Sequence, residues 1–338
     1  MNKKLIKFND LYLQYKNISN FIEKDFKKII RNTEFINGSF VKLFEKNFKK
    51  KNKSKFFFST NSGTDSLFIA LKTLGLNQGD EVITTAHSWI STSASITQAG
   101  GKVVFCDTDK NTFNINASEI EKKITKKTKG IIIVHLYGQP CDLDEILEIA
   151  KKFNIWIIED CAQAHFAEYK NKYVGNFGDI STFSFFPSKN LVAYGDAGGL
   201  ITNKKSLYIS SYMFAKNGGL IKNQHLVEGI NSRMDTFQAA VLNCKLKKIT
   251  HYTKNRIKLA KFYSKNLENV GDIVVPMVKK DRNHVFHLYV IKSKKRDKLK
   301  NFLQENNIEV ALHYPIALPF LKAYKYLNLK KKILLMRI

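Results

Sequence analysis

The stretch that decides the fold spans residues 131–165 and reads IIIVHLYGQPCDLDEILEIAKKFNIWIIEDCAQAH. Ile131–Leu136 is an apolar run typical of a buried strand, Leu143–Phe153 repeats apolar residues at helical spacing, and Ile155–Ile158 is strand-like again. The same alternation recurs upstream, with strands expected at 56–59, 81–85 and 103–106 and helices at 64–74, 88–98 and 117–124. Strands that alternate with helices predict an α/β fold whose largely parallel sheet is covered on both faces.

The alternation ends after Gly178. Ile180–Phe185 and Gly199–Thr202 are both strand-like, but the Gly-rich loop between them leaves no room for a crossover helix. We therefore expect at least one antiparallel strand in the sheet. Residues 1–50 are mostly helical in pattern, and a long helical pattern covers 237–267. Short strands at 273–275 and 287–291 and a helix at 299–306 predict a small C-terminal αβ domain. We expect a large domain at 1–245 and a small one at 246–338, with the boundary inside a helix.

The bulk composition is that of a globular protein, with 338 residues of which 44% are hydrophobic. No apolar run approaches the ~20 residues of a membrane span, and no long apolar region follows the N-terminal lysines. The cysteines at 106, 141, 161 and 244 form no CxxC pair. This spacing favours reduced thiols in a cytoplasmic protein over disulfides or structural zinc, and we expect no metal site.

The formal net charge is 56 − 29 = +27. Such a charge has three explanations: a compositional bias, electrostatic steering of an anionic small substrate, and nucleic-acid binding. The lysines are spread along the chain, and there is no zinc-finger spacing, RNP-like aromatic motif or basic-region heptad. Nucleic-acid binding is therefore not expected to be the main function.

Polar residues follow two of the expected strands. Asp160 and Gln163 come directly after the strand at 155–158, and Ser184 and Lys189 come at the end of the next one. This order suits pyridoxal phosphate (PLP): a lysine makes the Schiff base, and an aspartate holds the proton on the pyridine nitrogen. Gln163 could donate to the phenolic oxygen of the cofactor. The structural alternatives are a helix cap for Asp160, a surface lysine for Lys189 and a core residue for His165.

Two further features fit the same cofactor. The loop 59–67 joins a strand to a helix, where Gly63, the first helical amides and the hydroxyl of Ser62 or Thr64 suit a phosphate. An ordinary N-cap is the alternative, and no Gly-Lys-Ser/Thr ending makes it a P-loop. Trp89 follows another expected strand, where a flat ring could stack on the cofactor or fill the core.

Together, these motifs resemble the DegT/DnrJ/EryC1/StrS family of PLP-dependent nucleotide-sugar aminotransferases over roughly residues 8–324. The matching pieces are Ser62-Gly63-Thr64, Trp89 in Ser-Trp-Ile-Ser, the segments 159–165, 183–191 and 195–199, Asn231-Ser232-Arg233-Met234-Asp235, and Gln238-Ala239-Ala240. The resemblance implies fold type I, the aspartate aminotransferase-like architecture. It also implies a mixed, mostly parallel sheet between helices.

The resemblance also assigns roles to individual residues. Lys189 would form the Schiff base and shuttle the proton, and Asp160 would bind the pyridine nitrogen. Gln163 would contact the phenolic oxygen and Trp89 would stack on the ring, while the phosphate would be held by Gly63, Thr64 and Ser184. Asn231, or alternatively Arg233, would reach the phosphate of the other subunit in a homodimer with shared active sites.

The expected reaction follows from the same likeness. Lys189 argues against the family's sugar dehydratase branch, which has histidine there. The segments 189–198 and 312–315 resemble enzymes acting at C3, with His313 and Tyr314 near the sugar or its diphosphate. We expect amino transfer from glutamate to C3 of a dTDP-3-keto-6-deoxyhexose for surface-glycan biosynthesis. A C4 aminotransferase and a non-catalytic, PLP-binding regulatory protein are the alternatives.

The C-terminal residues 328–338 depart from the resemblance. The segment reads NLKKKILLMRI and lacks the acidic and proline residues expected there. A shifted reading frame or a truncation would explain the difference, which leads us to expect an incomplete small domain.

Overall fold

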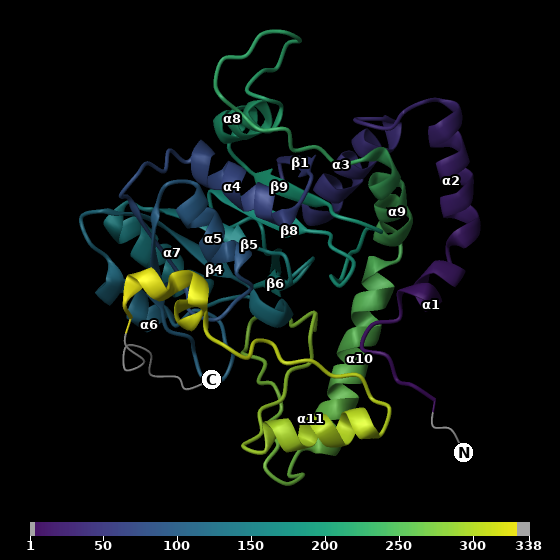
Figure 1. The fold of residues 1–338 in the computed structure, drawn as a ribbon, viewed down its shortest axis with the longest axis vertical. Coiled ribbons are helices and arrows are strands. Elements are labelled where there is room, and N and C mark those ends of the chain that lie inside the picture. Colours follow the sequence, from purple (N-terminus) through teal and green to yellow (C-terminus); the bar gives the residue numbers. More distant parts are fainter. Residues whose placement is uncertain (1–3, 330–338) are drawn as a thin grey trace.

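A seven-stranded sheet forms the centre of the computed structural model, which describes residues 4–329 (Figure 1). Its strand order is β1-β9-β8-β5-β4-β2-β3. The strands are β1 (Phe56–Thr60), β2 (Glu81–Thr85), β3 (Lys102–Cys106), β4 (Thr128–Val134), β5 (Trp156–Asp160), β8 (Ile180–Ser184) and β9 (Gly198–Thr202). β9 is antiparallel to both of its neighbours, whereas the pairs from β8 to β3 are parallel. The predicted mixed, mostly parallel sheet with an antiparallel strand is confirmed.

Helices cover both faces of this sheet. The helices between the strands are α4 (Gly63–Thr73), α5 (Ser91–Gln98), α6 (Ala117–Ile120) and α7 (Leu143–Phe153). A small separate hairpin pairs β6 (Glu168–Tyr169) with β7 (Lys172–Tyr173). The N-terminal helices are α1 (Leu11–Lys16), α2 (Ser19–Arg31) and α3 (Ser39–Asn52). The later helices are α8 (Lys205–Ala215), α9 (Thr236–Leu246), α10 (Ile249–Leu267) and α11 (Arg296–Glu305). Short 3₁₀ turns lie at Glu121–Lys123, Leu136–Gly138, Leu318–Phe320 and Lys322–Leu327.

Side chains alternate between the two faces of each strand, and this alternation decides which helices each side chain packs against. Ile158 belongs to the apolar cluster that includes residues of α4 and α5, whereas the preceding Ile157 belongs to the cluster that includes residues of α6 and α7. Successive strand residues point to opposite faces, and each fully buried isoleucine contributes about 1.5–3 kcal/mol. The same alternation places Asp160 on the α4–α5 side and Glu159 on the other side.

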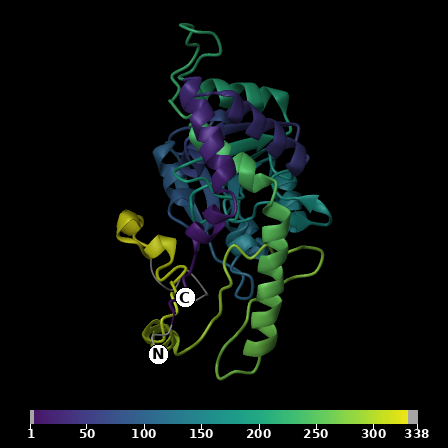
Figure 2. The same ribbon diagram turned by 90° about the vertical axis from the view of Figure 1, so that its right-hand side faces the viewer.

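The helical pattern at 237–267 is two helices rather than one. α9 ends at Leu246 and α10 begins at Ile249, with a turn in which the Lys248 amide donates to the Lys245 carbonyl at 2.9 Å. From this turn α10 runs away from the sheet (Figures 1 and 2). The predicted domain boundary near residue 245 coincides with the end of α9, and the division into two domains stays a prediction.

The strands expected at 273–275 and 287–291 are absent from the described residues. A single bridge joins Val274 and Lys292 there. In the second of these segments, the Leu288 amide instead donates to the Tyr137 carbonyl at 3.3 Å, and the His287 carbonyl accepts from the Arg256 guanidinium at 3.2 Å. Backbone groups satisfied in this way are not free to form a sheet ladder.

Three other expectations concern the chain as a whole. The tail on which a truncation was inferred lies almost entirely at 330–338, outside the described residues. Between residues 4 and 329 no helix has the length and apolarity needed to cross a membrane. Cys106, Cys141, Cys161 and Cys244 are free thiols, while the cytoplasmic location stays a prediction.

Candidate active site

A cavity of about 370 Å³ opens where the carboxyl ends of the parallel strands meet. β5 ends at Asp160 and β8 at Ser184, and both residues line the cavity. Such an edge is where open α/β sheets bind ligands. Of the residues predicted from the sequence, the cavity is lined by Gly63, Thr64, Trp89, Asp160, Gln163, Ser184, Lys189, His313 and Tyr314. Asn231 is exposed and lies outside its lining.

Asp160 is held from two sides at the floor of the cavity. Its Oδ2 accepts a hydrogen bond from the Thr92 hydroxyl at 2.9 Å, and its Oδ1 accepts one from the Ala162 amide at 3.1 Å. Burial raises the pKa of Asp160 above its ordinary value, although these bonds and the charge of Lys189 act in the opposite direction. No helix follows Asp160 directly, so the helix-cap alternative is wrong.

Lys189 lies in the loop after β8, facing the same cavity. The loop is closed on itself next to the strand, because the Ala193 amide donates at 2.8 Å to the carbonyl of Phe185, the first residue after β8. Burial lowers the pKa of the Lys189 amine, and the charge of Asp160 opposes that shift. A lysine whose charged form is disfavoured by burial is a better nucleophile than one at the surface.

Hydroxyl groups gather where α4 begins. Ser62 is the N-cap, since its Oγ accepts from the Asp65 amide at 3.0 Å. The Thr64 hydroxyl donates to Ser91 Oγ at 2.9 Å, and both residues line the cavity with Ser184. A Cβ on Gly63 would lie 2.7 Å from Ser184 Cβ, so only glycine lets α4 approach the end of β8 this closely. The first amides of α4 and these hydroxyls form a site suited to a phosphate.

Aromatic side chains form the rim of the cavity. The Trp89 side chain is 59% exposed, which excludes the core alternative for this residue. Its ring centroid lies 6.1 Å from that of Tyr314. A flat, accessible ring at this position can stack on a planar ligand.

Gln163 is oriented by the backbone. Its Oε1 accepts a hydrogen bond from the Tyr137 amide at 2.7 Å, and its Nε2 donates to the Tyr314 hydroxyl at 3.1 Å. Because an amide N–H can only donate, this contact fixes which way the Gln163 side chain points. The NH₂ group is therefore the end presented toward Tyr314, whose pKa burial raises to about 12.

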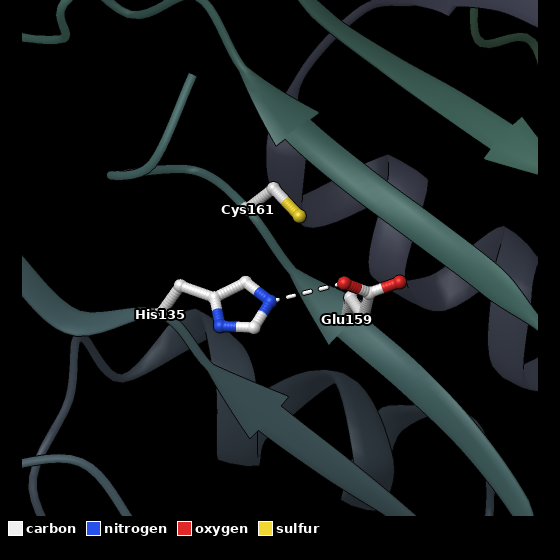
Figure 3. A group of neighbouring side chains, drawn as sticks. All are labelled: His135, Glu159 and Cys161. Atoms are coloured by element: carbon white, nitrogen blue, oxygen red, sulfur yellow. Dashed lines mark hydrogen bonds and ion pairs between the residues drawn. The ribbon is translucent and has the colours of Figure 1, made fainter. Parts of the chain in front are cut away.

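The opposite side of β5 holds a second, fully buried carboxylate (Figure 3). The Cys141 amide donates to His135 Nδ1 at 3.1 Å, so Nε2 carries the proton that His135 donates to Glu159 at 3.1 Å. Further hydrogen bonds reach the Glu159 carboxylate from the Gly175, Phe177 and Gly178 amides and from the Ser181 hydroxyl. Burial raises the pKa of Glu159, but the His135 contact and the amides outweigh it and hold the pKa below its ordinary value.

The three residues drawn in Figure 3 have the spacing of a metal site. Ligand atoms of His135, Glu159 and Cys161 all lie within 4.8 Å of one another. The hydrogen bonds above already use both Glu159 oxygens and both His135 nitrogens. We therefore interpret the cluster as a structural clamp that joins the ends of β4 and β5 to the loop before β8.

His165 fills the core, as the sequence-based alternative stated. Its ring lies 5.7 Å from that of Phe183 and 5.5 Å from that of Phe185, measured between centroids. Neither ring nitrogen has a hydrogen-bond partner within the described part of the chain, and burial lowers the pKa to about 3. The imidazole is therefore neutral near pH 7.

Several residues of the site were missed from the sequence. Thr92, Ser91 and Tyr137 all bind predicted residues, and the cavity is also lined by Ser88, Asp196 and His287. A signal existed for Tyr137, because it follows the end of β4 just as Gln163 follows the end of β5. Ser91 and Thr92 lie in the first turn of α5, where their hydroxyls resemble ordinary helix-start residues.

The chain belongs to the DegT/DnrJ/EryC1/StrS aminotransferase family, whose model matches residues 16–335. It is thus a PLP-dependent aminotransferase of fold type I, as the sequence predicted. Among curated relatives, a pleiotropic regulatory protein of Geobacillus stearothermophilus is 42% identical, over 95% of this chain and 87% of its own length. A dTDP-3-amino-3,6-dideoxy-α-D-galactopyranose transaminase of Aneurinibacillus thermoaerophilus is 38% identical, over 90% of this chain and 83% of its own.

Solved structures show the same architecture. DesV from S. venezuelae, solved with a ketimine intermediate, superposes with a TM-score of 0.93 at 31% identity, covering 95% of this chain and 87% of that one. NtdA from Bacillus subtilis, solved with bound PMP, gives a TM-score of 0.87 at 30% identity, covering 97% of this chain and 78% of that one.

The side chains and backbone amides around the cavity have the chemistry that this cofactor requires. Asp160 would hold the ring nitrogen, the corner at Gly63, Thr64 and Ser184 would hold the phosphate, and the Lys189 amine would hold the aldehyde carbon. When bound, PLP supplies an electron sink that lets a proton leave the carbon bearing the amino group. The Lys189 amine, whose pKa burial lowers, can accept that proton and return it elsewhere.

Proposed function

We propose that this chain transfers an amino group from glutamate to a keto sugar carried on a nucleotide, preferably to C3 of a dTDP-3-keto-6-deoxyhexose. The observation that carries the proposal is the gathering of Asp160, Gln163 and Lys189 with His313 and Tyr314 in one cavity. The first three suit the cofactor, and the last two come from a separate segment of the chain. This leaves side chains in the same space for a second ligand.

The names of relatives support a sugar nucleotide as that ligand. Besides the dTDP-sugar transaminase of Aneurinibacillus, they include a GDP-perosamine synthase of Escherichia coli at 38% identity and a UDP-2-acetamido-2-deoxy-3-oxo-D-glucuronate aminotransferase of Pseudomonas aeruginosa at 36%. These names share a nucleotide-linked sugar but differ in the nucleotide. The net charge of +27 favours the approach of such an anion, with a rate that falls as salt rises.

The experiment is a substrate screen of the PLP-loaded enzyme with glutamate as donor. dTDP-, GDP- and UDP-linked keto sugars with the ketone at C3 or C4 would be compared, and 2-oxoglutarate and the amino sugar measured. The proposal expects the highest kcat/KM for the dTDP 3-keto sugar. A preference for a 4-keto sugar would overturn the assignment of the carbon, and no turnover of any sugar would overturn the proposed class of substrate.

Asn231 carries a proposal about assembly. It is exposed and outside its own cavity, and the adjacent Ser232 hydroxyl is bonded to Asp65 at the start of α4 at 2.7 Å. We place Asn231 at the phosphate of the partner subunit in a homodimer. Mixing inactive Lys189→Ala and Asn231→Ala subunits should then restore activity, since one site of each mixed dimer is intact. No recovery in verified mixed dimers would contradict shared sites.

A regulatory role is the second candidate, and the name of the Geobacillus relative favours it. It predicts a protein that binds PLP but does not convert glutamate to 2-oxoglutarate. Release of 2-oxoglutarate in a single turnover would exclude a purely non-catalytic role.

A further inference from the structure

Tyr137 connects two parts of the site that are far apart in the sequence. Its backbone amide donates to Gln163 Oε1 at 2.7 Å, and its hydroxyl donates to the carbonyl oxygen of His313. Tyr137 adopts a left-handed conformation with φ of 57°, which is uncommon for a bulky residue. This backbone lets one residue bind Gln163 and the His313 segment at once.

A third contact completes the hydrogen bonding of the Tyr137 oxygen. His87 Nε2 lies 2.8 Å from the same oxygen. Since the single hydroxyl proton goes to His313, the imidazole must be the donor in this contact. Burial lowers the pKa of His87 to about 4, so the ring is neutral near pH 7 and carries its one proton on Nε2. The tyrosine oxygen therefore accepts from His87 while donating to His313.

Ring packing makes up much of the remaining contact to the segment that Tyr137 holds, since the Tyr314 ring lies 5.6 Å from that of His87 and 6.1 Å from that of Trp89. His313 stacks on Phe8 at a centroid separation of 5.9 Å, but Phe8 is itself 50% exposed. Tyr314 is held through Gln163, which depends in turn on the Tyr137 amide. Tyr137 is 3% exposed, so its hydroxyl gives His313 a buried anchor that water cannot easily replace.

We propose that the Tyr137 hydroxyl is a positioning group that holds His313 and Tyr314 over the cavity for the acceptor substrate. The inference rests on the proposed function for the identity of that substrate. Tyr137→Phe removes the hydroxyl but keeps the amide that orients Gln163. The expected result is a KM for the keto sugar about tenfold higher, with the rate of the glutamate half-reaction within about twofold of wild type.

A second readout does not need the sugar or the cofactor. Hydrogen exchange of amides 311–318, followed by mass spectrometry of the cofactor-free protein, should be faster in Tyr137→Phe than in wild type. Tyr289→Phe is the matched control, since it also loses a hydroxyl contact, to Ser264 at 3.0 Å, but lies outside the cavity lining. Its exchange in 311–318 and its KM should match wild type.

The outcomes separate the inference from the proposed function. Unchanged exchange in Tyr137→Phe, or equal losses with glutamate and the keto sugar, would overturn the positioning role. If wild-type enzyme converts no keto sugar, the proposed function fails, while the exchange measurement still decides whether Tyr137 positions the segment.

Discussion

The two sides of strand β5 carry adjacent carboxylates whose pKa values are shifted in opposite directions. On the clamp side, Glu159 is enclosed by His135, three amides and a serine hydroxyl, and its pKa lies below the ordinary value. On the cavity side, Asp160 accepts hydrogen bonds from Thr92 and Ala162, and its pKa is raised. Both are buried, so the number of donors, and not burial, separates them.

This difference separates a structural carboxylate from one available to a ligand. A fully satisfied carboxylate has no capacity left for a new partner, whereas one at the floor of a cavity can still bind a positively charged donor. Pairs of acidic groups whose pKa values are pushed apart commonly have different roles. We therefore expect changes on the cavity side to reduce activity and changes on the clamp side to reduce stability.

The largest expected effect belongs to Asp160→Asn. Amino transfer should fall about a thousandfold, since a neutral amide cannot hold the ring nitrogen protonated. At neutral pH the raised pKa means that ionised Asp160 opposes folding, so the free energy of unfolding should not fall. Steady-state assays and urea unfolding check both parts. An unfolded variant, or one with near-normal activity, would contradict the assignment.

Glu159→Gln should have the converse result. Breaking a buried charged network costs about 3 kcal/mol of unfolding free energy. Because the folded pKa is lowered, the ionised group stabilises the fold at neutral pH, and its advantage over Gln should shrink as pH falls below about 4.3. Urea unfolding at several pH values measures this. The exposed Glu148→Gln on α7 is the control and should change stability by less than about 0.5 kcal/mol.

Thr92→Val tests the cavity side with a smaller expected loss of activity than Asp160→Asn. It removes one of the hydrogen bonds that lower the pKa of Asp160. Activity should fall about tenfold, and the acidic limb of the pH–rate profile should move to higher pH. Thr97→Val is the control on the same helix, because that hydroxyl binds the Ala94 carbonyl and not the carboxylate. Equal losses in both variants would point to a general effect on α5.

The sequence predicted the strands and helices that have a clear apolar periodicity, and the site residues that directly follow those strands. Asp160 and Lys189 follow recognisable strands, and parallel strands bring their carboxyl ends together, so their meeting could be inferred. Thr92 could not be recognised, because a threonine in the first turn of a helix carries no sign of its distant partner. The strands predicted at 273–275 and 287–291 were wrong, since bonds such as those from Leu288 to Tyr137 and from Arg256 to His287 depend on tertiary packing.

The most direct test of the central claim is to locate the covalent link between PLP and the protein. Wild-type protein would be incubated with PLP, reduced with borohydride, digested and analysed by mass spectrometry, beside Lys189→Ala. The structure predicts the added cofactor mass on the peptide containing Lys189, a visible absorbance band before reduction, and loss of both in Lys189→Ala. Cofactor mass on a different lysine, or none in the wild type, would contradict the assignment of this cavity as the active site.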